Sequence, residues 1–196
     1  MGFSISWLAV QTEKHGELFK LANVCPTDEK DEYYESPVSG AALQGGWFLL
    51  VGQKCDNRLI QAELLTNISK LGPTLACSIE EHVMFSSASL WNAGSESWSV
   101  WHDPQNKGIY DLDYRGKTPD SFESLRNQIS KKQDEEGGEK ADVDLVFDIP
   151  LLLASELTGF KHDEDCDCFA DAYPVVFTDQ ASLRKQNARR AWWKIW

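Results

Sequence analysis

Apolar and polar residues follow strand-like patterns in several short stretches of the chain. Residues 2–10 (GFSISWLAV) alternate and then turn continuously apolar, which predicts a strand buried on both faces toward its end. A turn-rich stretch between residues 83–91 and 97–102 predicts a β-hairpin. Further strands are predicted at residues 45–51, 74–79 and 143–149, with a short one at 174–177.

Stretches with apolar residues at helical spacing lie between these strands. Ile60, Leu64, Ile68 and Leu71 form one stripe, which begins after the capping residue Asp56 and ends at Gly72-Pro73. Thr118-Pro119 is typical of a helix start. Helices are therefore predicted at residues 14–24, 56–71, from 118 to about 130, and 150–157.

This order of elements predicts an α+β fold with a mixed, mostly antiparallel sheet, a hairpin and helices packed largely on one face. Residues 1–180 are expected to form a single domain, followed by a basic, aromatic segment at 181–196. Residues 27–35, 106–116 and 131–140 are predicted to be loops. The expected core includes Ile5, Trp7, Phe48, Leu50, Leu75, Val146 and Phe147.

Charge is distributed unevenly along the chain, whose net charge is −12. Residues 184–196 hold five basic groups and no acid, so the remainder carries 14 basic and 31 acidic groups. An acidic body of this kind repels nucleic acid and anionic membranes and attracts basic proteins. A second interpretation is that the acidity only keeps the chain soluble.

Residues 184–196 allow two interpretations. Basic groups interleaved with Trp192, Trp193 and Trp196 could bind nucleic acid or lie on a membrane. The favoured alternative is a terminal helix that packs on the core, because the acidic body would oppose binding to a polyanion.

No apolar run reaches the roughly 20 residues that cross a bilayer, and residues 1–10 lack the regions of a signal peptide. A cytoplasmic protein with no membrane partner is therefore expected. Five cysteines, an odd number, argue against a disulfide framework in such a compartment.

Local catalytic signatures are absent from the sequence. It contains no GxGxxG, HExxH, GxSxG or CxxC motif, and Gly116-Lys117-Thr118 lacks the glycine-rich loop of a nucleotide site. No cofactor is expected. Catalytic groups can still converge from distant positions, so an enzyme remains an alternative.

Three histidines carry that alternative, a hydrolytic or metal-dependent enzyme. His162 opens the stretch HDEDCDC, whose imidazole, thiol and carboxylate groups are metal ligands. Only one residue separates Cys166 from Cys168 and no second ligand pair follows, so no metal site is predicted. His82 follows two glutamates and His102 precedes an aspartate, which makes each a candidate base.

The opening GFSISWLAV resembles the start of small uncharacterised bacterial proteins. In size, acidity and lack of a catalytic motif, the chain is also similar to bacterial immunity proteins, which neutralise toxins. The leading hypothesis is an acidic binding protein that docks onto a basic protein, with immunity as one form of that function. The predicted contact residues lie in two acidic loops: Asp28, Glu29, Asp31 and Glu32, and Asp163, Glu164, Asp165 and Asp167.

Overall fold

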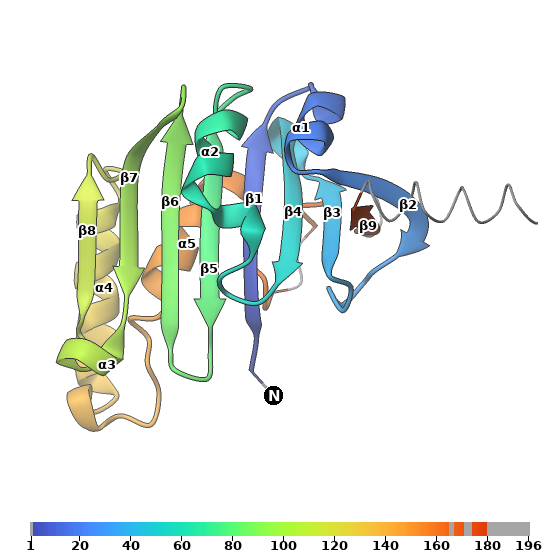
Figure 1. Ribbon diagram of the computed structural model, residues 1–196. Helices are drawn as coiled ribbons and strands as arrows, with labels where there is room; N and C mark the ends of the chain where they lie inside the picture. The colour runs from blue at the N-terminus through green and yellow to red at the C-terminus, as the bar shows by residue number, and fades with distance from the viewer. Residues whose placement is uncertain (1, 165–166, 171–173, 180–196) are drawn as a thin grey trace, which may run out of the picture.

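Antiparallel strands form one continuous sheet with helices on both faces in the computed structural model (Figure 1). The structure describes residues 2–164, 167–170 and 174–179. Within these residues, the strands lie side by side in the order β2 (Val24–Lys30), β9 (Val175–Asp179), β3 (Val38–Ala42), β4 (Trp47–Gln53), β1 (Ser4–Gln11), β5 (Thr74–Glu80), β6 (Phe85–Asn92), β7 (Ser95–His102) and β8 (Leu112–Gly116). Every neighbouring pair among them is antiparallel. The predicted α+β class and the β6–β7 hairpin are confirmed.

The helices divide between the two faces of the sheet, where the sequence had suggested one. On one face lie α1 (His15–Leu21), the short helix η2 (Arg58–Ile60) and α2 (Ala62–Ile68); on the other lie α4 (Phe122–Glu135) and α5 (Asp148–Thr158) (Figure 1). The central strand β1 explains this arrangement. Ile5 and Trp7 pack in the cluster that contains α4 and α5, whereas Leu8 and Val10 pack in the cluster that contains α1 and α2. A strand buried on both faces needs a cover on each.

All seven residues predicted for the core are buried, but two of them are not on a strand. Residues 143–147 form turns that lead into α5, so the strand predicted at 143–149 is wrong. Asp144 is the physical reason, because its carboxylate accepts a hydrogen bond from the backbone N–H of Phe147. Such a side-chain bond competes with extended structure.

Three strands were missed because their sequences lack an apolar pattern. β8 lies within the predicted loop 106–116 and is mostly exposed at the sheet edge. The short helix α3 (Pro104–Lys107) overlaps the start of that loop. β2 covers the start of the predicted loop 27–35 and forms the other edge. β3 reads VSGAA, and a Cβ on its Gly40 would lie 2.7–2.9 Å from Phe177, Leu50 and the Leu49 carbonyl. Small residues here let three strands pack closely.

The predicted loop 131–140 is largely helical: α4 continues to Glu135, and the short helix η3 (Gly138–Lys140) follows. A further short helix, η1 (Gln44–Gly46), precedes β4. Among the described residues, no helix is both long and apolar enough to cross a membrane. The basic, aromatic segment 181–196 lies outside the described residues.

Candidate functional site

A buried carboxylate organises the first acidic loop, residues 31–36. Asp31 Oδ1 accepts a hydrogen bond from Glu35 N, and Oδ2 accepts one from Ser36 N, each at 3.0 Å. The hydroxyl of Ser39, on β3, also donates to Oδ2. Burial raises the pKa of Asp31, but the bonds from Ser39, Ser36 and Glu35 outweigh it, so this pKa lies below its ordinary value. Asp31 therefore holds the loop together and does not offer its charge to a partner.

The same loop turns one tyrosine inward and its neighbour outward. Tyr34 has a left-handed backbone (φ 55°), its carbonyl accepts a hydrogen bond from Gln53, and its ring packs edge-on against Phe160. Burial, followed by the charge of Asp31, raises the pKa of its hydroxyl. Tyr33 is 71% exposed, and the flanking Glu32 and Glu35 are also exposed. A fixed loop thus presents an aromatic ring between carboxylates.

Two further predicted contact residues lie directly before this loop. Asp28 and Glu29 are exposed on the edge strand β2. Neither side chain forms an ion pair with the residues that the structure describes. The backbone N–H of Asp31 then donates to the Pro174 carbonyl at 2.9 Å, which ties the end of this strand to the sheet beside it.

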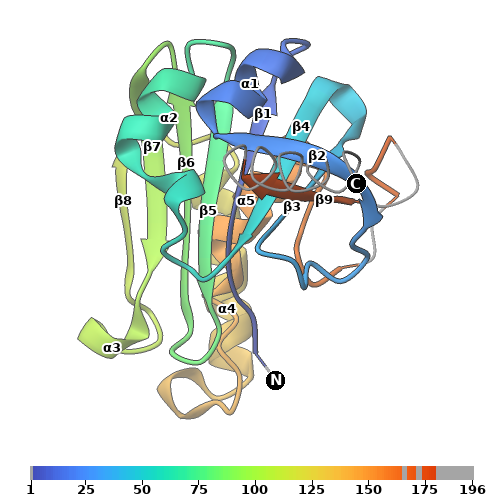
Figure 2. The ribbon, with the colours of Figure 1, turned by 45° about the vertical axis from the view of Figure 1, so that its right-hand side comes forward.

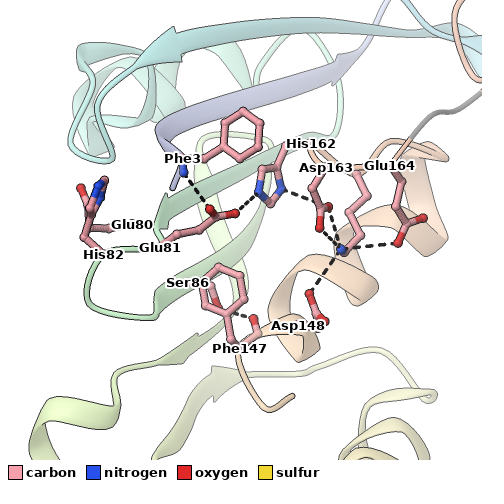
Figure 3. Close-up of polar contacts among 11 residues, drawn as sticks. Phe3, Glu80, Glu81, His82, Ser86, Phe147, Asp148, His162, Asp163 and Glu164 are labelled. Carbon is pink, nitrogen blue, oxygen red and sulfur yellow. Dashed lines mark hydrogen bonds and ion pairs between the residues drawn. The ribbon is translucent and has the colours of Figure 1, made fainter. Parts of the chain in front are cut away.

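A buried lysine, Lys161, organises residues 161–164, the start of the second acidic segment; Asp148, Asp163 and Glu164, labelled in Figure 3, surround its ammonium group. Lys161 is 6% exposed, and its Nζ lies 2.7 Å from Asp163, 3.3 Å from Asp148 and 3.4 Å from Glu164. Burial lowers the pKa of Lys161, but the hydrogen bond to Asp163 and the carboxylate charges outweigh it and raise this pKa overall. Lys161 thereby partly neutralises Asp163 and Glu164, both of which are exposed at the surface.

The three carboxylates around Lys161 differ in their environments. Burial raises the pKa of Asp148 above its ordinary value despite the nearby lysine. Burial also raises the pKa of Asp163, but the hydrogen bond from Lys161 and the charge of His162 outweigh it, so this pKa lies below its ordinary value. Asp167 is exposed, and Asp165 lies outside the described residues.

His162 joins this segment to the start of the chain. Its side chain is only 1% exposed, its Nε2 lies 3.2 Å from Glu81, and its ring packs edge-on against Phe3 (Figure 3). The same glutamate accepts a hydrogen bond from the backbone N–H of Phe3 at 2.7 Å. His162 Nδ1 is buried without a hydrogen bond, at 3.7 Å from Asp163. These contacts fix the segment after α5 against the β5–β6 turn.

The structure brings the two acidic segments together. The ring centroids of Tyr34 and Phe160 lie 6.0 Å apart. Tyr34 belongs to loop 31–36, and Phe160 directly precedes Lys161. Phe160 packs in turn against the buried Trp7. The turn between β2 and β3 and the chain after α5 run close together on the same side of the molecule (Figure 2). The first acidic loop thus contacts the residue that directly precedes the second acidic segment.

The three histidines do not form a common site. His82 is exposed and pairs with Glu80 at 2.7 Å. His102 is fully buried: its Nδ1 lies 2.7 Å from the Asp111 carbonyl and its Nε2 2.8 Å from Asp144. A carbonyl only accepts, so Nδ1 donates, and both ring nitrogens of His102 are occupied. His102 links β7 to the turn before α5 and has no side-chain bond to the other two histidines.

Metal ligands do not gather in the part of the chain that the structure describes: no group of three His, Cys, Asp or Glu side chains could hold an ion there. Cys168 is disulfide-bonded, although the odd number of cysteines had argued against a disulfide framework; Cys25, Cys55 and Cys77 are free. Cys166 lies outside the described residues.

Searches of protein-family models, curated proteins and solved structures found no match to this chain. Sequence reasoning missed the roles of Ser39, Tyr34 and Lys161. The bonds from Asp31 to N–H groups four and five residues later have no signature in the residue types, and the partners of Tyr34 and Lys161 depend on tertiary packing.

Proposed function

We propose that this chain is a binding protein that docks onto a basic protein partner through the acidic loop 31–36 and the residues beside it. The observation that carries the proposal is the fixed loop in which Glu32, exposed Tyr33 and Glu35 project from the scaffold of Asp31 and Tyr34. Asp28 and Glu29 on one side, and Asp163, Glu164 and Asp167 on the other, extend its negative charge.

This arrangement suits arginine and lysine side chains on a partner. Carboxylates pair with guanidinium groups in two-point geometry, and an open tyrosine ring attracts a cation over its face. Because the loop is already ordered by internal hydrogen bonds, binding would cost little conformational entropy. Carboxylates that served only to keep the protein soluble would not need a loop held in one conformation by internal hydrogen bonds.

Bacterial immunity proteins are one class of acidic binding protein, and neutralising a basic toxin is the narrower form of this proposal. The enzyme alternative is less well supported, because the buried contacts of His102 and His162 connect elements of the fold. His82 pairs with Glu80 at the surface.

Affinity capture from the native host, read by mass spectrometry, tests the proposal. The loop variant carries Glu32→Gln and Glu35→Gln, and Tyr33→Ala is made separately. The control carries Glu17→Gln and Glu63→Gln, which remove the same charge from exposed positions on α1 and α2. We expect the wild type and the control to retain the same basic protein and the loop variant and Tyr33→Ala to lose most of it. Equal retention by the loop variant and its control would contradict the proposal.

A further inference from the structure

Strand β8 forms one edge of the sheet, and within the described part of the chain no other strand lies beyond it (Figure 1). Asp113, Tyr114 and Arg115, in the middle of the strand, are exposed. The opposite edge strand, β2, contains Pro26 and a register shift, two features that hinder pairing with a further strand. β8 has neither, and its register with β7 is regular. Its outer side is therefore able to pair with another strand.

The backbone bonds between β7 and β8 show which groups of β8 face outward. The N–H of Asp103 donates to the Asp111 carbonyl at 3.4 Å, just before the strand. The N–H of Lys117 donates to the Ser97 carbonyl at 3.3 Å, just after it. Both bonds join residues that are directly opposite in the register, and such bonded pairs alternate along antiparallel strands. The odd-numbered residues of β8 thus bond to β7, and Tyr114 points its N–H and C=O away from the sheet.

The two side chains that flank Tyr114 carry opposite charges and lie on the same face of the strand. The guanidinium of Arg115 lies 5.2 Å from the ring centroid of Trp101, and it pairs with no carboxylate among the residues that the structure describes. Asp113 pairs with Lys107 at 3.2 Å, but the aspartate side chain is 51% exposed. A carboxylate has room for a second cation. The edge therefore offers one cation and one anion, two residues apart.

We propose that β8 pairs with β8 of a second copy of this chain, antiparallel, about a twofold axis at Tyr114. Each Tyr114 then lies opposite its own copy, and the two residues exchange N–H···O=C bonds. Asp113 of each copy lies opposite Arg115 of the other, in a non-hydrogen-bonded pair, where side chains are closest. A shift of two residues would bring either Asp113 or Arg115 opposite itself. Since like charges directly opposite are destabilising, charge selects the symmetric register.

The strength of this contact follows from its size. β8 has five residues, so the paired edges bury less than the roughly 1,200 Å2 of a standard stable interface. We expect a weak dimer with a Kd of about 10–100 µM. The dimer joins the two sheets into one and leaves β2, the strand before the acidic loop 31–36, at each outer end. The pairing goes beyond the proposed function and does not depend on it.

Sedimentation velocity of the full-length protein tests the inference at concentrations on both sides of this Kd, from about 5 µM to about 500 µM. We expect monomer at the lower limit and mostly dimer at the upper one. Arg115→Glu and Asp113→Arg each place like charges opposite one another at both symmetry-related pairs, and each should weaken the dimer at least about tenfold. Lys20→Glu, at an exposed position on α1, makes the same change of charge as Arg115→Glu and should leave the Kd unchanged.

Exchanging the two charges separates a specific pairing from a general effect of charge. The double variant Asp113→Arg with Arg115→Asp has opposite charges across the axis again, and we expect its Kd to return to within about threefold of wild type. Tyr114→Cys should form a disulfide between two copies under mild oxidation, because opposite residues of a hydrogen-bonded pair lie about 5.5 Å apart at Cα. Tyr33→Cys, exposed in the acidic loop, should not.

A protein that stays monomeric at about 500 µM would overturn the inference, because the expected Kd lies well below this concentration. Unchanged dimerisation by both single charge variants, or a folded double variant that stays monomeric, would also contradict it. The loop variant Glu32→Gln with Glu35→Gln leaves β8 intact and should dimerise as the wild type does. Failure of the proposed partner binding is therefore distinguishable from failure of this pairing.

Discussion

Replacing Asp31 by alanine should destabilise the fold as well as the loop. The substitution removes an acceptor from three hydrogen bonds, and bonds to a charged group contribute about 1.5–3 kcal/mol each. Water can replace part of this at Glu35, which is exposed, but Ser39 is fully buried and would keep an unpaired hydroxyl. We therefore expect the free energy of unfolding to fall by about 2–4 kcal/mol.

Urea unfolding followed by tryptophan fluorescence measures this loss, provided that the dependence of the free energy on urea concentration stays unchanged. Asp28→Ala is the matched control, because Asp28 is exposed on the neighbouring strand and should change stability by less than about 0.5 kcal/mol. A loss below about 1 kcal/mol for Asp31→Ala would refute the scaffold role.

The contribution of Asp31 to stability depends on pH with a definite sign. The folded protein holds the pKa of Asp31 below its ordinary value, so the unfolded chain binds more protons there. The stability that Asp31 contributes is present above about pH 4 and is lost as the pH falls through the lowered pKa. Asp31→Asn should flatten this part of the acid limb; an unchanged acid limb would contradict the reasoning.

Three other outcomes follow from the packing and the buried polar groups. Phe48→Ala should cost about 3–5 kcal/mol in urea unfolding, because the ring packs against Phe19 and Phe177; a loss below about 1 kcal/mol would contradict this packing. His102→Ala should cost about 3–5 kcal/mol, since it leaves the Asp144 carboxylate buried without its partner, whereas the exposed His82→Ala should cost less than about 0.5 kcal/mol. Purified protein should hold less than stoichiometric zinc by elemental analysis, and a chelator should not change Tm; stoichiometric zinc lost on replacing Cys166 and Cys168 by serine would overturn this prediction.

Burial could be predicted from the sequence more reliably than strand position. β1 alternates before it turns apolar, β4 opens with an apolar run and β5 is mostly apolar, so each was placed correctly to within a few residues. The stretch 143–149 alternates as the start of β1 does, and yet it forms bends and turns to Phe147 and then begins α5, because the Asp144 side chain bonds to the backbone of Phe147. Periodicity cannot detect such a local competition.

The acidic residues show a similar division. The sequence identified both acidic segments, but it could not separate a carboxylate that supports a loop, Asp31, from one that faces solvent, Glu32. It also treated His162 as a candidate ligand, whereas packing buries it against Glu81 and Phe3. The partners of Asp31 lie only four to eight residues away and depend on how the loop folds, whereas His162 contacts Glu81, 81 residues away in the sequence.

The rate of association with the captured basic partner tests the central proposal most directly. Stopped-flow or surface-based kinetics would compare the loop variant with the Glu17→Gln, Glu63→Gln control at about 0.01 M and about 0.1 M salt, where the Debye length falls from about 30 Å to about 10 Å. We expect wild type and control to associate faster at low salt, and the loop variant to associate at least about fivefold more slowly than its control, with less change in dissociation. Association that is insensitive both to salt and to the loop substitutions would show that the acidic loop is not the contact surface.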